Sequence, residues 1–298
     1  AEGEEEEDED EDDKEGETTI DKQQLLRDIN NKALKRTAQR RLDTHPILQS
    51  RVPLIKITDL ATGFNLDISM ENDLSLHKAK LLAAYVSVDA RFPQLLQLTK
   101  HWAKNRRIND AAAHTLNSFG YTLLAIQFLQ TRSPPILPCL QDSAITVGKA
   151  TIACPRALDT PGLSLEIRFQ GQQAGGIPEE LKSFGKPNTS PVSRLFVEFL
   201  HFIAVELDFE KHCVSVRKGA LQPINKGQFK HKHAPELCVE DPFDEADNVS
   251  RSLTEASVKR VRLEFLRAYQ IMSTTGDFAW CCAPYLAGGG GRGTRTDG

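Results

Sequence analysis

The sequence has few cysteines and no long apolar run, and each shortage excludes a class of protein. Its 298 residues hold six scattered cysteines without a Cys-x-x-Cys pair, which argues against a disulfide framework and for a reducing compartment. No run of about 18 or more apolar residues and no signal-peptide pattern is present, so we expect no membrane span. The first residue is not Met, so we expect it to be an internal or processed point of a longer product.

The net charge of −4 combines two oppositely charged parts. Residues 1–17 hold 13 acids and one lysine, whereas the rest of the chain holds 36 basic and 28 acidic side chains. A block of like charges repels itself and cannot be buried, so residues 1–19 are expected to form a disordered acidic leader. A basic body is typical of a protein that binds a polyanion, although ordinary surface charge explains the same count.

The hydrophobic pattern of the front end predicts both helix and strand. Apolar residues at helical spacing predict a helix from Asp21 to Leu42, which Pro46 would close. The segments VPLIKI (52–57) and FNLDI (64–68) are typical of strands, and Gly63 lies in the turn that joins them.

Helical spacing dominates the chain from residue 72 on. Helices are expected to begin near Asn72, Pro93, Thr115, Ser193 and Val258. The third of them, which ends at Gln130, is almost entirely apolar and should lie in the core, and Ser193 would cap the fourth. About sixty residues before that helix are rich in Pro, Gly and Ser without clear periodicity, and CVSVR (213–217) is typical of a short strand.

The segment KHWAKNRR (100–107) carries a candidate phosphate site. Lys100 and Lys104 are spaced i and i+4, so they lie one above the other on a helix, and Arg106 and Arg107 follow at its end. The segment contains no acid to pair them, which suits a clamp for phosphate groups. A basic helix end that complements the helix dipole is the equally weighted alternative.

Two further segments carry candidate nucleotide contacts. In TLNSFGY (115–121) the hydroxyl of Ser118 and the ring of Phe119 would bind phosphate and stack on a base, although core packing is the commoner role of such a ring. In EDPFDEADNVSR (240–251) a turn can present carboxylates that accept hydrogen bonds from the amino groups of a base, and the candidates are Glu240, Asp241, Asp244, Glu245 and Asp247. A capped loop before a helix is the alternative.

Two metal sites can be considered from the sequence. His231, His233 and Cys238 form a weak candidate zinc set, because a second cysteine pair at ligand spacing is missing. Asp67 lies between Leu66 and Ile68 within a strand-like segment. It is either a solvent-facing residue of a half-buried strand or a metal ligand at the end of a sheet.

Several segments, taken in order, resemble one family. They are VPLIKITDLATGFNLDIS, MENDLSLHKAKLLAAYV, RFPQLLQLTKHWAKNRRIND, TLNSFGYTLL, PPILPCLQ and CVEDPFDEADNVSRS. Together they are similar to terminal uridylyltransferases and cytoplasmic-type poly(A) RNA polymerases of the DNA polymerase β superfamily, from about Ile29 to Arg267. The resemblance implies transfer of a nucleoside monophosphate from UTP or ATP to an RNA 3′-hydroxyl, with two Mg²⁺ or Mn²⁺ ions roughly 3.5–4 Å apart.

The resemblance also implies roles for single residues. Asp67 matches the third metal-binding aspartate of the family, which makes it the candidate catalytic residue. Lys100 and Lys104 match the lysines that hold the triphosphate, and Ser118 matches a phosphate-binding serine.

The remaining matches concern the sugar and the base. Asn72 matches the asparagine that contacts the ribose, and Phe119 replaces the tyrosine that stacks on the base. Asp241 and Asp244 match acidic residues near the base edge.

The chain departs from the family pattern at three places. It contains no Gly-Ser dipeptide and no Asp-x-Asp after a strand, so we expect the polypeptide alone to have little or no activity. Lys78 and Ala79 stand where relatives often carry Asn-Thr beside the sugar, and Lys78 is counted among the candidate nucleotide-binding residues. Asp247 stands where uridine-selective members have histidine. An ionised aspartate only accepts hydrogen bonds, so this residue favours the amino group of adenine and hence ATP. The choice between UTP and ATP stays open.

The prediction is therefore an α+β protein. Residues 20–71 would be a partial nucleotidyltransferase palm and residues 72–275 a mostly helical central domain. That domain would include a PAP-associated segment at about 193–250, and residues 276–298 would form a flexible Gly-rich tail.

The predicted function is RNA 3′-terminal nucleotidyl transfer by a monomer in the cytoplasm, with the nucleus as the other compartment. The alternatives are a catalytically inactive RNA-binding or scaffold relative, and a relative that makes nucleotide second messengers without RNA.

Overall fold

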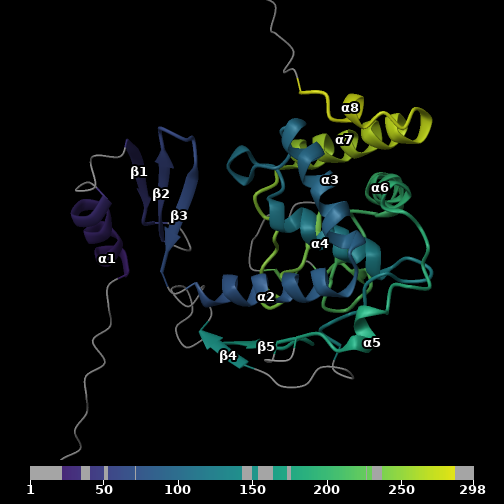
Figure 1. Cartoon of the computed structure of the whole chain (residues 1–298), viewed down its shortest axis with the longest axis horizontal. Helices are drawn as coiled ribbons and strands as arrows, with labels where there is room; N and C mark the ends of the chain where they lie inside the picture. Colours follow the sequence, from purple (N-terminus) through teal and green to yellow (C-terminus); the bar gives the residue numbers. More distant parts are fainter. Residues whose placement is uncertain are drawn as a thin grey trace, which may run out of the picture. The chain divides into compact units, whose positions relative to one another are not determined.

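The computed structural model describes residues 22–34, 41–49, 53–70, 72–142, 150–153, 164–172, 176–225, 227–229 and 237–285. The chain divides into two compact units, Ala1–Asn72 and Asp73–Gly298, each with its own helices and strands (Figure 1). The predicted α+β class is thus confirmed. The acidic leader, His231, His233 and residues 286–298 lie outside the described residues.

The first unit is a small sheet with a helix on one face. Its elements are α1 (Lys22–Asp28), the π-helical turn η1 (Ile29–Leu34), β1 (Leu42–Ile47), β2 (Leu54–Asp59) and β3 (Asn65–Ser69). The strands are antiparallel in the order β1-β2-β3. Leu26 of α1 packs with Ile55 and Ile57 of β2 in the core of this unit. The alternation of strand residues leaves the other face of the sheet polar.

One predicted element of this unit is correct and one is wrong. The β2–β3 hairpin is confirmed, with Gly63 at a φ of 73°, a conformation that glycine adopts without strain. The predicted helix to Leu42 is wrong, because the described helical segment ends at Leu34 and Leu42 begins β1. Pro46 does not close a helix but pairs with Ile55. It is tolerated there because β1 is an edge strand, where one row of N–H groups needs no partner.

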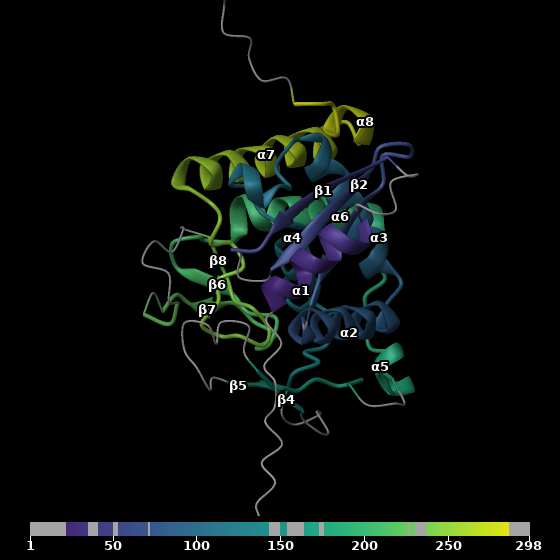
Figure 2. The same ribbon diagram turned by 90° about the vertical axis from the view of Figure 1, so that its left-hand side faces the viewer.

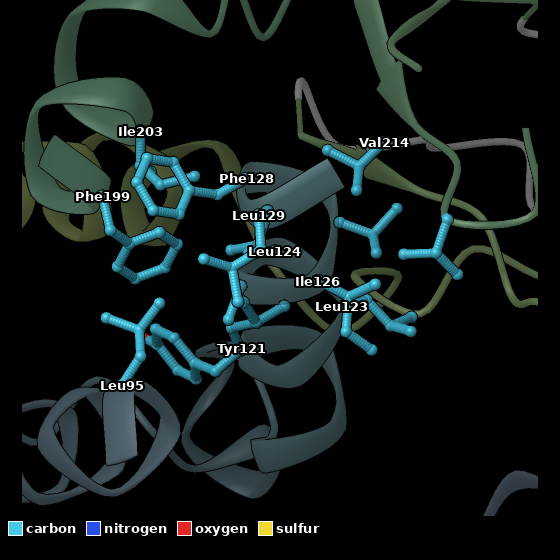
Figure 3. Close-up of a cluster of buried hydrophobic side chains, with 14 of the residues drawn as sticks. Leu95, Tyr121, Leu123, Leu124, Ile126, Phe128, Leu129, Phe199, Ile203 and Val214 are labelled. Atoms are coloured by element: carbon cyan, nitrogen blue, oxygen red, sulfur yellow. The ribbon is translucent and has the colours of Figure 1, made fainter. Parts of the chain in front are cut away.

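The helices of the second unit enclose one apolar core. They are α2 (Asp73–Val88), α3 (Arg91–Asn105), η2 (Ala111–Ala113), α4 (Ser118–Gln130), α5 (Glu179–Lys182), α6 (Val192–His201) with its π-helical continuation η4 (Phe202–Glu206), α7 (Glu255–Thr274) and α8 (Phe278–Cys281). Every residue of α4 from Gly120 to Gln130 is buried, which confirms the predicted central helix. Figure 3 shows Tyr121 and Phe128 of this helix among the same buried side chains as Leu95 of α3 and Phe199 of α6.

Two small sheets complete the second unit. β4 (Ala150–Ala153) and β5 (Ser164–Ile167) form an antiparallel pair within the stretch that lacks clear periodicity. β7 (Gln222–Pro223), β6 (His212–Val214) and β8 (Cys238–Val239) form the second sheet in that order (Figure 2). Two buried amides of α4 bind the two residues that directly follow β6. Gln127 Oε1 accepts a hydrogen bond from the Ser215 N–H at 2.9 Å, and Gln130 Nε2 donates to the Val216 carbonyl at 3.1 Å.

The cap of α6 and the end of the ordered fold differ from those predicted. Ser193 does not cap α6, because Pro191 holds the cap position without a side-chain hydrogen bond and Ser193 lies in the first turn. The ordered fold also runs past Thr275, where we expected a flexible tail to begin. Asp277 caps α8 and Cys281 is fully buried against the core. Among the described helices, none is both long and apolar enough to cross a membrane.

Candidate functional site

Asp67 lies on β3, on the polar face of the first unit's sheet. Ile55 and Ile68 are directly opposite each other on the other face, toward α1. The residue opposite Asp67 is Lys56, and the residue opposite Lys56 is His45. All three side chains are exposed. The strand position of Asp67 is therefore confirmed, whereas its role as a metal ligand stays a prediction.

The described residues do not complete a two-metal site. A carboxylate such as Asp67 is a ligand that Mg²⁺ and Mn²⁺ prefer. However, no group of three or more His, Cys, Asp or Glu side chains that could hold a metal ion occurs in the part of the chain that the structure describes. One carboxylate cannot hold two ions, so no chemical step can be assigned to a metal from these residues alone.

Three predicted nucleotide-binding residues meet in the second unit. Lys78 of α2 forms an ion pair with Asp241, and its Nζ lies 5.0 Å from the centre of the Phe119 ring of α4. Asp241 is fully buried, and its Oδ1 also accepts hydrogen bonds from the N–H groups of Phe243 and Asp244 at 3.0 and 3.2 Å. The folding of the chain thus joins an aromatic ring, a cation and a carboxylate from three distant segments.

The acidic loop that contains Asp241 is held by its own backbone. The Asp241 N–H donates to the Asp247 carbonyl at 3.1 Å, and the Asp247 N–H donates to the Asp244 carbonyl at 2.8 Å. Both carboxylate oxygens of Asp247 accept hydrogen bonds from Arg251 Nη1, at 2.8 and 3.0 Å. Asp241, Asp244 and Asp247 are all buried. The sequence predicted carboxylates that face a base, but the structure places these three in the interior of the loop.

The two lysines predicted to hold phosphate lie on α3. Lys100 is half-buried, and burial lowers the pKa of its ammonium group, whereas Lys104 one turn later is exposed. No carboxylate within the described residues forms an ion pair with either of them. Both are therefore available to an anion from outside the chain.

Arg106, which follows Lys104 in the same basic segment, has a structural role instead. It is the residue at which α3 ends, and its side chain is buried. The Arg106 guanidinium donates to both carboxylate oxygens of Glu264 on α7, at 2.8 and 2.9 Å, and this pair raises its pKa. Arg106 is therefore not part of the phosphate site that the sequence suggested.

The N-terminus of α4 is organised by two asparagines. Asn117 is the cap residue, and its Oδ1 accepts a hydrogen bond from the Gly120 N–H at 2.8 Å. Ser118, which the sequence suggested as a phosphate ligand, is exposed and exchanges hydrogen bonds with Asn109 at 3.1 and 3.2 Å. Its phosphate role stays a prediction, as does the sugar contact of Asn72, which directly precedes α2.

Sequence reasoning missed two residues of this region. Arg251 pairs with Asp247 at i and i+4, a spacing that could have indicated the pair before the structure was known. Asn109 is nine residues from Ser118, so no short-range pattern points to that contact.

Two family models match the chain. The model "Cid1 family poly A polymerase" matches residues 191–247. The model "Poly(A) RNA polymerase, mitochondrial-like, central palm domain" matches residues 7–87.

The chain is also similar to curated proteins, of which it spans only a part. It is 31% identical to human terminal uridylyltransferase 7 over 226 residues, which are 76% of this chain and 14% of that protein. It is 31% identical to the poly(A) RNA polymerase cid13 of Schizosaccharomyces pombe over 244 residues, 80% of this chain and 39% of that protein. The chain therefore spans well under half of the length of these relatives.

Solved structures share the fold. A crystal structure of the Cid1 poly(U) polymerase with Mg and 3′-dATP has a TM-score of 0.71 at 23% identity, over 90% of this chain and 78% of that one. A cytoplasmic RNA terminal U-transferase has a TM-score of 0.69 at 25% identity, over 88% of this chain and 76% of that one.

Proposed function

Since the chain belongs to the family of terminal uridylyltransferases and Cid1-type poly(A) RNA polymerases, we propose that it binds the nucleoside triphosphate used for RNA 3′-terminal nucleotidyl transfer. The observation that carries the proposal is the meeting of Lys78, Phe119 and Asp241 in one cluster. A partly exposed aromatic ring beside the Lys78 ammonium suits a nucleobase, because the ring can stack on the base and the ammonium can donate hydrogen bonds to it.

The proposed reaction joins the RNA 3′-oxygen to the α-phosphorus of UTP or ATP. The bond from that phosphorus to the bridging oxygen of the β-phosphate breaks, and pyrophosphate leaves. Lys100 and Lys104 would neutralise the triphosphate and then the pyrophosphate, because neither ammonium is used by a carboxylate of the described residues. Phe119 would hold the base, and Ser118 with Asn109 would orient a phosphate oxygen.

Asp67 is proposed as one ligand of a divalent metal, Mg²⁺ or Mn²⁺. Such an ion would supply charge neutralisation and activation of the attacking hydroxyl. The described residues hold no group of three or more His, Cys, Asp or Glu side chains that could bind a metal ion, and the sequence holds no Gly-Ser followed by Asp-x-Asp. We therefore expect this polypeptide alone to bind nucleotide but to transfer little of it.

The lack of a complete metal-binding group among the described residues and of Gly-Ser followed by Asp-x-Asp in the sequence also favours a second candidate. This candidate is a relative that binds RNA or nucleotide without catalysis. A polypeptide that also carries a Gly-Ser and Asp-x-Asp segment separates the two candidates. If that polypeptide extends an RNA 3′ end and Asp67→Ala abolishes the extension, the transferase assignment holds. Extension by the Asp67→Ala variant at the wild-type rate would refute the role of Asp67. A product formed equally well without RNA would point to a nucleotide second messenger instead.

Nucleotide binding by the chain itself tests the phosphate site. The double variant Lys100→Ala/Lys104→Ala should weaken UTP and ATP binding at least roughly tenfold, since a hydrogen bond to a charged group contributes about 1.5–3 kcal/mol. The control is Lys211→Ala/Lys259→Ala, which removes the same charge from two exposed lysines that are ion-paired elsewhere. Equal affinities of the two double variants in calorimetric titrations would refute the site.

A further inference from the structure

Helix α3 ends in a Schellman motif, and an arginine stands at the position where glycine is usual. The Arg107 N–H donates to the Lys104 carbonyl at 3.0 Å. The Ile108 N–H donates to the Ala103 carbonyl, also at 3.0 Å. These two hydrogen bonds define the motif, which places a residue with positive φ just past the helix end. That residue is Arg107, with a φ of 54°.

The left-handed conformation of Arg107 is unfavourable for a residue that carries a Cβ atom. The surrounding structure imposes it. Ile108 is fully buried, and Arg260 Nη2 donates to the carbonyls of Arg106 and Arg107 at 3.2 Å each. Glycine would meet the same backbone requirement without strain. The backbone alone therefore gives no reason for an arginine at this position, and the reason must lie in the side chain.

The Arg107 side chain is exposed. Within the part of the chain that the structure describes, its guanidinium forms no ion pair or hydrogen bond. The neighbouring Arg106 differs, because its guanidinium is buried against Glu264. Of the two arginines in the basic segment, Arg107 is therefore the one that can bind a molecule from outside the chain.

Arg107 lies beside the residues that are proposed to bind phosphate. A hydrogen bond closes the turn from Lys104 to Arg107, which keeps their two Cα atoms within about 7 Å of each other. The carbonyl of the residue after Arg107 accepts a hydrogen bond from the Tyr121 hydroxyl of α4 at 2.7 Å. Asn109 then contacts Ser118, the first residue of α4. These contacts bring the end of α3 and the start of α4 together.

We propose that Arg107 binds the third, terminal phosphate (the γ-phosphate) of the nucleoside triphosphate. This inference rests on the proposed function. A base stacked on Phe119 places the first phosphate near Ser118, the residue before it, so the phosphate chain leads from α4 toward the end of α3. The terminal phosphate carries the largest negative charge, and a guanidinium can bind two of its oxygens at once. Arg107 thus extends the clamp formed by Lys100 and Lys104.

The test compares the binding of UTP, ATP and UDP to the whole chain by calorimetric titration, with Mg²⁺ present throughout. Arg107→Ala should weaken UTP binding roughly tenfold, the effect of about one hydrogen bond between charged groups. ATP binding should weaken by the same factor, because a phosphate contact does not depend on the base. UDP binding should stay unchanged, because UDP lacks the third phosphate.

A glycine variant separates ligand binding from backbone structure. Arg107→Gly removes the guanidinium and the backbone strain together, since glycine adopts a positive φ freely. Its melting temperature should stay at or above that of the wild type, whereas its UTP affinity should fall as far as that of Arg107→Ala. His114→Gly makes the same backbone change at an exposed residue with a φ of 56° and should leave UTP binding unchanged.

Two further variants control for charge. Arg107→Lys keeps a positive charge without the planar fork and should give a UTP affinity between those of the wild type and Arg107→Ala. Arg194→Ala removes an exposed arginine from α6 and should leave the UTP and UDP affinities unchanged.

The outcomes distinguish this inference from the proposed function. If Arg107→Ala and Arg107→Gly bind UTP as tightly as the wild type does, or if UTP and UDP binding weaken equally, the γ-phosphate contact is refuted and the nucleotide site stands. A loss of UTP affinity in Arg107→Gly that comes with a lower melting temperature would likewise refute it, because the arginine would then be structural. If the wild-type chain binds none of the three nucleotides, the proposed function fails and this inference fails with it.

Discussion

Replacing Lys78 by alanine should destabilise the second unit, because it leaves the Asp241 charge buried without its cation. Asp241 is fully buried and Lys78 is mostly buried. Breaking such a pair by removing one partner costs about 3–5 kcal/mol. The two backbone N–H groups at 3.0 and 3.2 Å still stabilise the carboxylate in the variant. We therefore expect a loss of about 2–4 kcal/mol in the free energy of unfolding.

The measurement is urea unfolding followed by circular dichroism, together with thermal unfolding. A loss of about 3 kcal/mol corresponds to a decrease of roughly 6–12 °C in the melting temperature of a unit of this size. Lys80→Ala is the matched control, since Lys80 is exposed on the same helix two residues away. That control should change the free energy of unfolding by less than about 0.5 kcal/mol.

A double-mutant cycle with Asp241→Asn isolates the pair itself. Each single variant removes the ion pair, so the two losses should not add. The coupling energy should lie at about 0.5–3 kcal/mol, the range for residues in direct contact. If Lys78→Ala costs no more than Lys80→Ala, or if the cycle gives no coupling, the argument from the buried charge is wrong.

Three further predictions concern the stability of the second unit. Glu264→Ala should cost about 3–5 kcal/mol in urea unfolding because it leaves the Arg106 guanidinium buried without its carboxylate, whereas Glu255→Ala, in an exposed pair, should leave the unfolding midpoint close to that of the wild type. Asn117→Ala should cost about 1 kcal/mol by removing the cap of α4, and an unchanged unfolding midpoint would contradict this. Burial raises the pKa of Cys213 from 9.0 to about 12. Stability from the protonated thiol is full below pH 9.0 and is lost toward pH 12, so that Cys213→Ala should flatten the decline seen in urea titrations across this range.

Local pattern was enough for much of the fold. The helices α2, α3 and α4 were predicted because their apolar residues repeat at helical spacing over three or more turns. The β2–β3 hairpin was predicted because two strand-like segments flank a short turn that contains Gly63, a pattern that is typical of a hairpin. These signals lie within one element, so they need no knowledge of distant partners.

The errors arose where the secondary structure of a segment depends on its pairing with another segment. The start of strand β1 was predicted to be the end of a helix, because its edge position depends on β2, which supplies its hydrogen bonds. The pair β4–β5 was missed because its two strands are separated by a long stretch and are defined by each other.

For the candidate site, the sequence likewise determined which residue types are present, and the tertiary structure decided which of them contact one another. The order of residues along the chain is enough to establish that lysines, an aromatic ring and a group of aspartates occur as they do in the family. The packing of distant segments settles which carboxylates are buried against cations and which cations remain exposed, because Lys78 and Asp241 meet only when the core forms. Burial, nearby charges and hydrogen bonds determine how an ionisable side chain behaves, and the packing of the folded chain determines all three.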